Sequence, residues 1–135
     1  MTHCALFDND KIKCWGNNNM GQLGLGDIRP RESANDLGDN LPFVDLGTGI
    51  KPTKIIAEGE QSVCALFDNG KVKCWGSNYF GKLGIGTQDR SRGGMPNQMG
   101  DNLPFVELGE SEVAIDLAAG THHVCALIVD GKVKC

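Results

Sequence analysis

SVCALFDNGKVKCWG, at residues 62–76, decides how the rest of the chain is organised, because the sequence contains this stretch three times. THCALFDNDKIKCWG occupies residues 2–16, and HVCALIVDGKVKC occupies residues 123–135. Equivalent cysteines in successive copies lie 60 and 61 residues apart. A fixed period of this length indicates a repeat protein, in which each unit buries its apolar surface against its neighbours.

Each copy has the pattern of a β-hairpin, since an apolar run and an alternating run flank a short turn. In the middle copy we expect a three-residue loop over 68–70, in which a type I turn is followed by Gly70 in the left-handed conformation. This loop places Cys64 directly opposite Cys74, whereas a two-residue loop would place Cys64 opposite Trp75. The same loop predicts positive φ angles at Gly131 and at Asp10, and aspartate tolerates this conformation better than most residues do.

The three-residue loop sets two cysteines opposite each other in every copy, which predicts one disulfide per hairpin. The predicted pairs are Cys4–Cys14, Cys64–Cys74 and Cys125–Cys135. Zinc ligation and buried free thiols are the alternatives, although the ten-residue step lacks the close Cys-x-x-Cys spacing of zinc sites. Because disulfides persist in oxidising surroundings, the pairing predicts an extracellular protein or one of the secretory lumen. Its export signal would then have been removed or would lie outside this stretch.

The composition favours a folded all-β protein with many turns. Of the 135 residues, 40% are hydrophobic, and the 19 glycines and five prolines are spread along the chain. The formal net charge of −4 gives no basic face for nucleic acid or for an anionic membrane surface. No apolar run approaches the 18 residues of a membrane-spanning segment.

The segments between the hairpins repeat as well, and we expect each complete unit to contain four antiparallel strands. In the first complete unit the expected strands cover about 41–46, 53–58, 62–68 and 71–76. LPFVDL at 41–46 recurs as LPFVEL at 103–108, and the strand after it is expected at 113–118. No helix is expected.

The chain therefore forms one tandem-repeat region with about two and a half units. The predicted parts are a half unit at 1–15, complete units at 41–76 and 103–135, and glycine-rich connections at 16–40 and 77–102. GNNNMGQLGLGD in the first connection recurs as GSNYFGKLGIGT in the second.

The aligned pattern CALxDNGKVKCWGxNxxGxLGxG resembles the regulator of chromosome condensation (RCC1) repeat family. This resemblance implies β-propeller blades of four antiparallel strands, of which family members typically have seven. The paired cysteines are similar to those of secreted members rather than to the nuclear exchange factor. Two and a half blades do not close such a ring, which implies an incomplete ring or a segment of a longer array.

The candidate binding residues have simpler structural interpretations. Trp15 and Trp75, which follow the second cysteine of their hairpins, are expected to pack against a neighbouring blade, with sugar stacking as the alternative. His122 and His123 invite a metal interpretation, but other residue types replace them in the aligned copies, which favours a surface role. We expect no catalytic group, no cofactor and no metal.

Three functions remain for such a chain. The first is a non-enzymatic extracellular scaffold, and the second is a secreted protein-binding propeller that acts as an adhesin or inhibitor. The third, guanine-nucleotide exchange on a small GTPase, is implied by the family resemblance alone. The expected partner is another protein, or further copies of the repeat, with carbohydrate as a weaker alternative. Because the hairpin at 2–15 lacks inner strands, we expect its edge to be covered by upstream sequence or by another copy.

Overall fold

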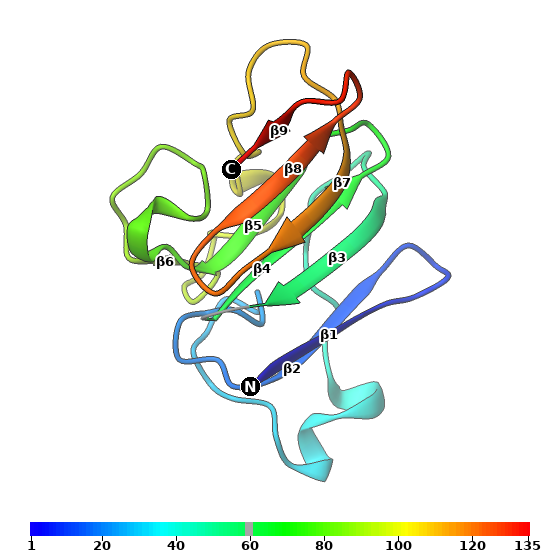
Figure 1. Ribbon diagram of the computed structural model, residues 1–135. Coiled ribbons are helices and arrows are strands. Elements are labelled where there is room, and N and C mark those ends of the chain that lie inside the picture. Colours follow the sequence, from blue (N-terminus) through cyan, green and yellow to red (C-terminus); the bar gives the residue numbers. More distant parts are fainter. Residues whose placement is uncertain (59–60) are drawn as a thin grey trace.

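The computed structural model describes residues 1–58 and 61–135, which form three antiparallel sheets (Figure 1). The first sheet pairs β1 (Thr2–Leu6) with β2 (Ile12–Gly16). The second contains, in spatial order, β3 (Pro52–Glu58), β4 (Ser62–Phe67), β5 (Val72–Ser77) and β6 (Ser91–Arg92). The third contains β7 (Ala114–Ala119), β8 (Val124–Ile128) and β9 (Val133–Lys134). We call these sheets the first, second and third blades.

The blades pack face to face in chain order, with β1 in contact with β3 and β3 in contact with β7 (Figure 1). Successive side chains of a strand point to opposite faces of its sheet, so the second blade contributes to two cores. Val63, Ala65 and Phe67 of β4 pack toward the first blade. Cys64 and Leu66 of the same strand pack toward the third. This alternation joins three thin sheets into one layered structure.

The hairpins have the register that the three-residue loop predicts. Cys4 is paired with Cys14, and Cys64 with Cys74, across their strands. The left-handed turn residues are those expected, with φ angles of 63° at Asp10, 76° at Gly70 and 89° at Gly131. In each hairpin the residue before the loop accepts a hydrogen bond from the amide of this turn residue.

The segments at 41–46 and 103–108 were expected to be strands, and this prediction is wrong. Both are extended but belong to no sheet. Leu41, Val44 and Leu46 are buried, a spacing that breaks the two-residue alternation of a strand. Each segment instead crosses between two blades and is held by backbone hydrogen bonds. Val44 donates to Ile12, Val106 donates to Val72, and Glu107 donates to Gly84.

The fourth strand of the second blade is β6, which follows the hairpin instead of preceding it. The four-stranded sheet therefore runs over 52–92, displaced from the expected unit at 41–76. The first blade has the counterpart of β6 as a single bridge between Gly16 and Arg31. The expected strands at 53–58, 62–68, 71–76 and 113–118 agree with β3, β4, β5 and β7 to within two residues at each end.

Four short 3-10 turns interrupt the connections in the described part of the chain. They are η1 (Ala34–Asp36), η2 (Gly38–Asn40), η3 (Tyr79–Gly81) and η4 (Gly100–Asn102). Within residues 1–58 and 61–135, no helix is long and apolar enough to cross a membrane.

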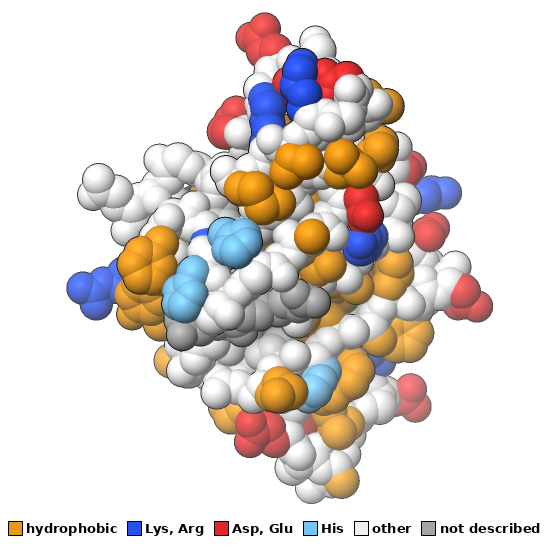
Figure 2. Space-filling model, viewed as in Figure 1, with side chains coloured by type: hydrophobic (Ala, Val, Ile, Leu, Met, Phe, Trp, Pro, Cys, Tyr) orange, Lys and Arg blue, Asp and Glu red, His pale blue; other side chains and the backbone are white. Residues whose placement is uncertain are grey.

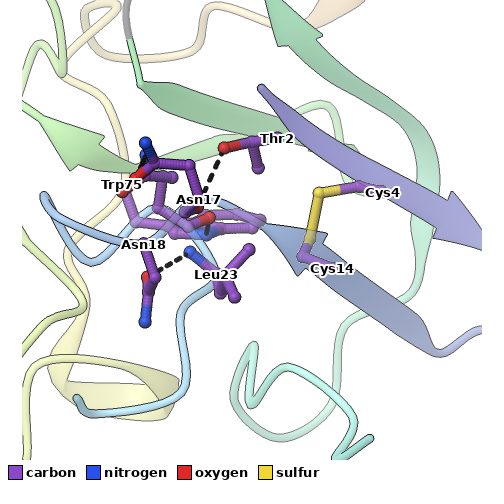
Figure 3. Close-up of a disulfide and its surroundings, with 8 residues drawn as sticks. Thr2, Cys4, Cys14, Asn17, Asn18, Leu23 and Trp75 are labelled. Atoms are coloured by element: carbon purple, nitrogen blue, oxygen red, sulfur yellow. Dashed lines mark hydrogen bonds between the residues drawn. A yellow bond between two sulfur atoms is a disulfide. The ribbon is translucent and has the colours of Figure 1, made fainter. Parts of the chain in front are cut away.

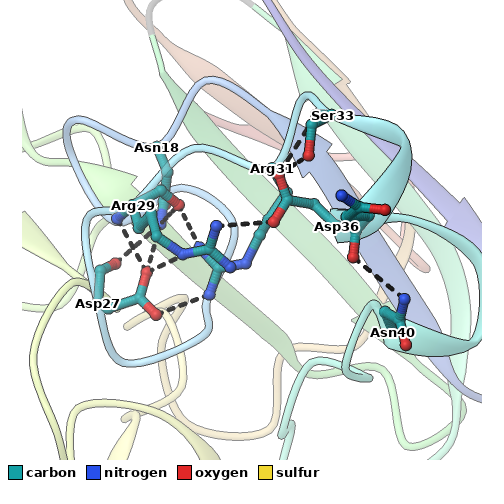
Figure 4. A network of polar contacts seen from close by, with 8 residues as sticks. Asn18, Asp27, Arg29, Arg31, Ser33, Asp36 and Asn40 are labelled. Carbon is teal, nitrogen blue, oxygen red and sulfur yellow. Dashed lines mark hydrogen bonds and ion pairs between the residues drawn. The ribbon is translucent and has the colours of Figure 1, made fainter.

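A buried asparagine organises each glycine-rich connection. The side-chain nitrogen of Asn18 donates to the carbonyls of Asp27 and Arg29 (Figure 4). Its side-chain oxygen accepts a hydrogen bond from the amide of Leu23 (Figure 3). Asn78 makes the equivalent bonds in the second connection. Because these bonds satisfy the backbone of the loop internally, a long segment without regular structure stays ordered against the blade.

Candidate docking faces of the blades

The second blade shows what a covered blade face looks like in this molecule. Its face toward the third blade carries the Cys64–Cys74 disulfide, flanked by Leu66 and Val72. All four residues are at most 5% exposed, because Leu117, Ala126 and Ile128 of the third blade belong to the same core.

The third blade repeats this face and leaves it open. The Cys125–Cys135 disulfide occupies the position of Cys64–Cys74. Leu127 is 37% exposed and Val133 is 62% exposed, although their counterparts in the second blade are buried. We call these four residues the third-blade outward face, and it has the composition of a blade interface without a covering blade.

The first blade has an exposed face at the other end of the molecule, on the side that points away from the second blade. His3, Phe7 and Trp15 take the positions that Val63, Phe67 and Trp75 hold in the second blade. Phe7 is 42% exposed and contacts Phe43 edge-on, with ring centroids 6.0 Å apart. Phe67, by contrast, is 2% exposed and packs in the same way against Phe105. We call His3, Phe7, Trp15 and Phe43 the first-blade outward face.

A lysine in each hairpin ties its blade to the segments that cross between blades. The Lys73 ammonium, which is 3% exposed, donates to the carbonyl of Leu46 at 2.8 Å and to that of Gly100 at 2.9 Å. Of the two equivalent carbonyl groups, Lys13 bonds among the described residues to that of Gly38, the counterpart of Gly100. Lys134 bonds to Leu108, the counterpart of Leu46. Burial lowers the pKa of Lys73, while Asp101 and Asp45 oppose that shift.

These lysines were missed by the sequence analysis, although a signal for them was present. Each immediately precedes the second cysteine of its hairpin, so the position is occupied by lysine in every copy. An invariant charge beside alternating apolar residues is the sign of a side chain with a fixed partner.

Lys54 of β3 joins the second blade to β7 of the third blade. Its ammonium bonds to the carboxylate of Asp116 and donates to the carbonyl of Leu117 at 3.0 Å. The hydrogen bond from Lys54 and a second from the Leu117 amide lower the pKa of Asp116.

The two tryptophans differ in burial. Trp75 is completely buried in the core between the first and second blades, and its Nε1 donates to the carbonyl of Gln22 at 3.0 Å. Figure 3 shows its ring lying under the first connection, near Leu23 and the Cys4–Cys14 disulfide. A buried ring has no free face, so sugar stacking on Trp75 is ruled out. Trp15 is half-buried and stacks on His3 at 5.9 Å.

The histidine pair is not part of a metal cluster in the described residues. No group of three or more histidine, cysteine, aspartate or glutamate side chains is placed to hold a metal there. His122 contacts Phe80 edge-on at 5.6 Å. All six cysteines are joined in the three predicted disulfides.

Comparisons with known proteins agree with the repeat architecture. Two models described as regulator of chromosome condensation (RCC1) repeats match residues 2–22 with 55–82 and residues 69–127, which together make up more than half of the chain. The chain belongs to the RCC1 repeat family.

The relatives of this RCC1 repeat chain are longer proteins with different names. It is 31% identical over 96% of its length to the guanine nucleotide exchange factor SRM1 of Saccharomyces cerevisiae, and covers 24% of that protein. It is 30% identical over 96% of its length to the human probable E3 ubiquitin-protein ligase HERC4, and covers 11% of it. The chain thus spans a quarter or less of the length of these relatives.

Solved structures show the same fold for the RCC1 repeats. Human WBSCR16 superposes with a TM-score of 0.72 at 18% identity, covering 98% of this chain and 29% of that one. Prp20p from Saccharomyces cerevisiae superposes with a TM-score of 0.68 at 21% identity, covering 98% and 30%. The three sheets are therefore a segment of a β-propeller.

Proposed function

We propose that the chain is a non-enzymatic protein-interaction segment whose outward blade faces dock against further RCC1 repeats, with a second copy of this chain as the occupant. One observation carries the proposal: the third-blade outward face has the same residues as the second-blade face that is buried inside the molecule. A face built for burial leaves apolar area in water until another surface covers it.

The opposite ends of the molecule are suited to each other. The first-blade outward face carries aromatic rings at the positions where Phe67 and Trp75 contact a preceding blade. Docking the third blade of one copy on the first blade of the next would reproduce the contact between neighbouring blades. Such a contact is heterologous, so it produces a closed ring or an open filament.

An oxidising compartment is the second part of the proposal. One disulfide links the two strands of each hairpin. In the chain-entropy model, closing an 11-residue loop in this way adds about 2.8 kcal/mol to the free energy of unfolding. Disulfides of this kind persist in extracellular or secretory surroundings, where a structural scaffold of stacked blades would operate.

Sedimentation of the oxidised chain tests the docking of copies. We expect species heavier than the 14.5 kDa chain, in proportions that rise with concentration. Leu127→Lys places a charge on the third-blade outward face and should give a folded monomer. Val129→Lys is the matched control, because Val129 is 62% exposed in the hairpin loop, outside this face. A folded wild-type monomer at every concentration would overturn the proposal.

Regulation of a small GTPase is a second candidate, favoured by one observation. The relative named a guanine nucleotide exchange factor is 31% identical over nearly the whole chain. Release of a fluorescent guanine nucleotide from Gsp1p, a protein to which Prp20p binds, is the measurement that checks it. Acceleration of release by the isolated chain would favour this candidate, and an unchanged rate would exclude it for this segment.

A further inference from the structure

Arg90 and Arg92 of the second connection are arginines without an internal partner. Neither makes a side-chain hydrogen bond, an ion pair or a ring contact within residues 1–58 and 61–135. The Nε of Arg92 is buried and has no hydrogen-bond acceptor there. Arg29 and Arg31 of the first connection, by contrast, are each ion-paired to an aspartate. A buried donor without an acceptor is rare in folded proteins, because its hydrogen bonds to water have been lost.

Arg31 shows how this molecule holds a guanidinium at the edge of a blade. Its backbone is paired with Gly16, and the backbone of Arg92 is paired with Gly76 at the same place in the second blade. The Arg31 guanidinium donates to both carboxylate oxygens of Asp27, at 3.1 and 2.7 Å (Figure 4). These two hydrogen bonds make a bidentate pair, which is the strong and directional arrangement of arginine with a carboxylate.

The second connection has a threonine in the place of Asp27. The carbonyl of Thr87 accepts a hydrogen bond from the side-chain nitrogen of Asn78, as that of Asp27 does from Asn18. The two side chains also act alike, since each accepts a hydrogen bond from the amide two residues further along the chain. A threonine hydroxyl has no negative charge, and one residue more separates it from the arginine than in the first connection. Among the described residues, the second blade therefore keeps the arginine without its counter-charge.

The two arginines lie together at the outer edge of the second blade. β6 is the last strand of its sheet, so one of its edges is unpaired. The Asn78 amide donates to the carbonyl of Arg90, which continues the β6 ladder by one step. Residues two apart on a strand point to the same face, so the side chains of Arg90 and Arg92 project from the same face of β6. On the face of the molecule in Figure 2, acidic and basic side chains are scattered, so the choice of a charged partner there depends on individual side chains.

We propose that Arg92, with Arg90 beside it, binds the carboxylate of an aspartate or glutamate in a partner polypeptide. The planar guanidinium has N–H donors in a fork that matches the two oxygens of a carboxylate, and the Arg31 site uses this match within the chain. A carboxylate bound through Nε and one terminal nitrogen would supply both the counter-charge of Arg92 and the acceptor that its Nε lacks. Neither arginine belongs to the outward blade faces, so the site does not depend on their docking.

NMR signals of the arginine Nε–H groups, which report on each guanidinium separately, test the proposal. During titration with an acetylated and amidated tri-aspartate peptide we expect a saturable shift of the Arg92 signal. The Arg31 signal is the internal control, because its guanidinium is already held by Asp27 and should not shift. The tri-asparagine peptide is the matched neutral probe and should not bind. Equal shifts of all arginine signals, or tighter binding of inorganic phosphate than of the acidic peptide, would overturn the proposal.

Two variants test the location of the site. Arg92→Lys keeps the charge but removes the fork, so it should weaken binding of the acidic peptide about threefold to tenfold. Thr87→Asp supplies a carboxylate from the chain itself, so it should shift the Arg92 signal without peptide and lower the affinity about tenfold. Thr87→Asn is its uncharged control and should bind as the wild type does. Wild-type affinity in both Arg92→Lys and Thr87→Asp would overturn the proposal. Leu127→Lys, which blocks the docking of copies, should still bind the acidic peptide, so each proposal can fail without the other.

Discussion

Asp10 adopts at the first hairpin turn the left-handed conformation that glycine adopts in the other two, with a φ angle of 63°. Asp10→Gly should therefore leave the free energy of unfolding unchanged or raise it by up to about 1 kcal/mol, because glycine has no Cβ to strain there. The ion pair with Lys51, at 3.9 Å between exposed side chains, contributes little. Thermal melts of Asp10→Gly measure the effect.

Asp8→Gly is the control for that change, since Asp8 lies in the same loop without a positive φ angle. Glycine there only adds freedom to the unfolded chain, so the melting temperature should fall slightly. A clear loss of stability in Asp10→Gly would contradict the interpretation that the left-handed conformation of Asp10 in the three-residue loop is strained.

Asp27 makes the stability of the first connection depend on pH. Its carboxylate accepts hydrogen bonds from Arg31 and from the Arg29 amide (Figure 4). The Arg31 bond is the main cause that lowers the pKa of Asp27. A carboxyl group with a lowered folded pKa stabilises the fold above its unfolded pKa of about 3.9, and this stability is lost as the pH falls through the lower folded value.

Asp27→Asn should therefore melt at a lower temperature than the wild type at pH 7, and the difference should shrink below about pH 4. Melts of both proteins between pH 7 and pH 2 check this expectation. Other carboxyl groups, including Asp36, are present in both proteins and do not affect the difference. A difference that stays constant over the whole range would mean that the charge of Asp27 has no role.

At the scale of the elements, Lys73 connects β5 with the two segments that cross between blades. Lys73→Met removes two hydrogen bonds and leaves two carbonyl groups without this donor, which should cost about 2 kcal/mol of unfolding free energy. Lys13→Met is the matched control, because Lys13 has the same position but only one such bond and is less buried. Denaturant unfolding compares them, and an equal loss in both would contradict the role of burial.

The disulfides stabilise each hairpin as an element. Replacing Cys64 and Cys74 together with alanine should lower the free energy of unfolding by about 3 kcal/mol or more, because the loop-closure term of about 2.8 kcal/mol is joined by lost packing in a buried core. The same pair of changes at Cys125 and Cys135 lacks most of the packing loss, since Cys135 is exposed. Denaturant unfolding of both variants gives the comparison. Equal losses would show that the buried position adds nothing.

At the scale of the whole molecule, Trp75 holds the first blade on the second. Trp75→Ala should cost about 3–5 kcal/mol, and the loss should fall mainly on contacts with the first blade. Hydrogen exchange should then become faster over β1 and β2, while β7 and β8 keep their protection. Uniformly faster exchange would show instead that the three blades unfold as one unit.

The sequence by itself determined the hairpins. Loop length fixes strand register, so the position of Gly70 was enough to pair Cys64 with Cys74, and the same count held in the other copies. The repeat of this pattern also identified the family and its blades. These features depend on contacts between residues only a few positions apart, which a short stretch of sequence contains.

Only the tertiary structure decided how the segments between the hairpins are used. LPFVDL has the composition of a strand, yet Val44 and Leu46 are buried between two blades and pair with no sheet. β6 has only two residues, which is too short for an alternating pattern of apolar and polar side chains. It is a strand only because it pairs with the free edge of β5. The exposure of the outward faces likewise depends on how the blades pack against one another. Such contacts join residues tens of positions apart. They depend on how the blades pack, which a local sequence pattern does not reveal.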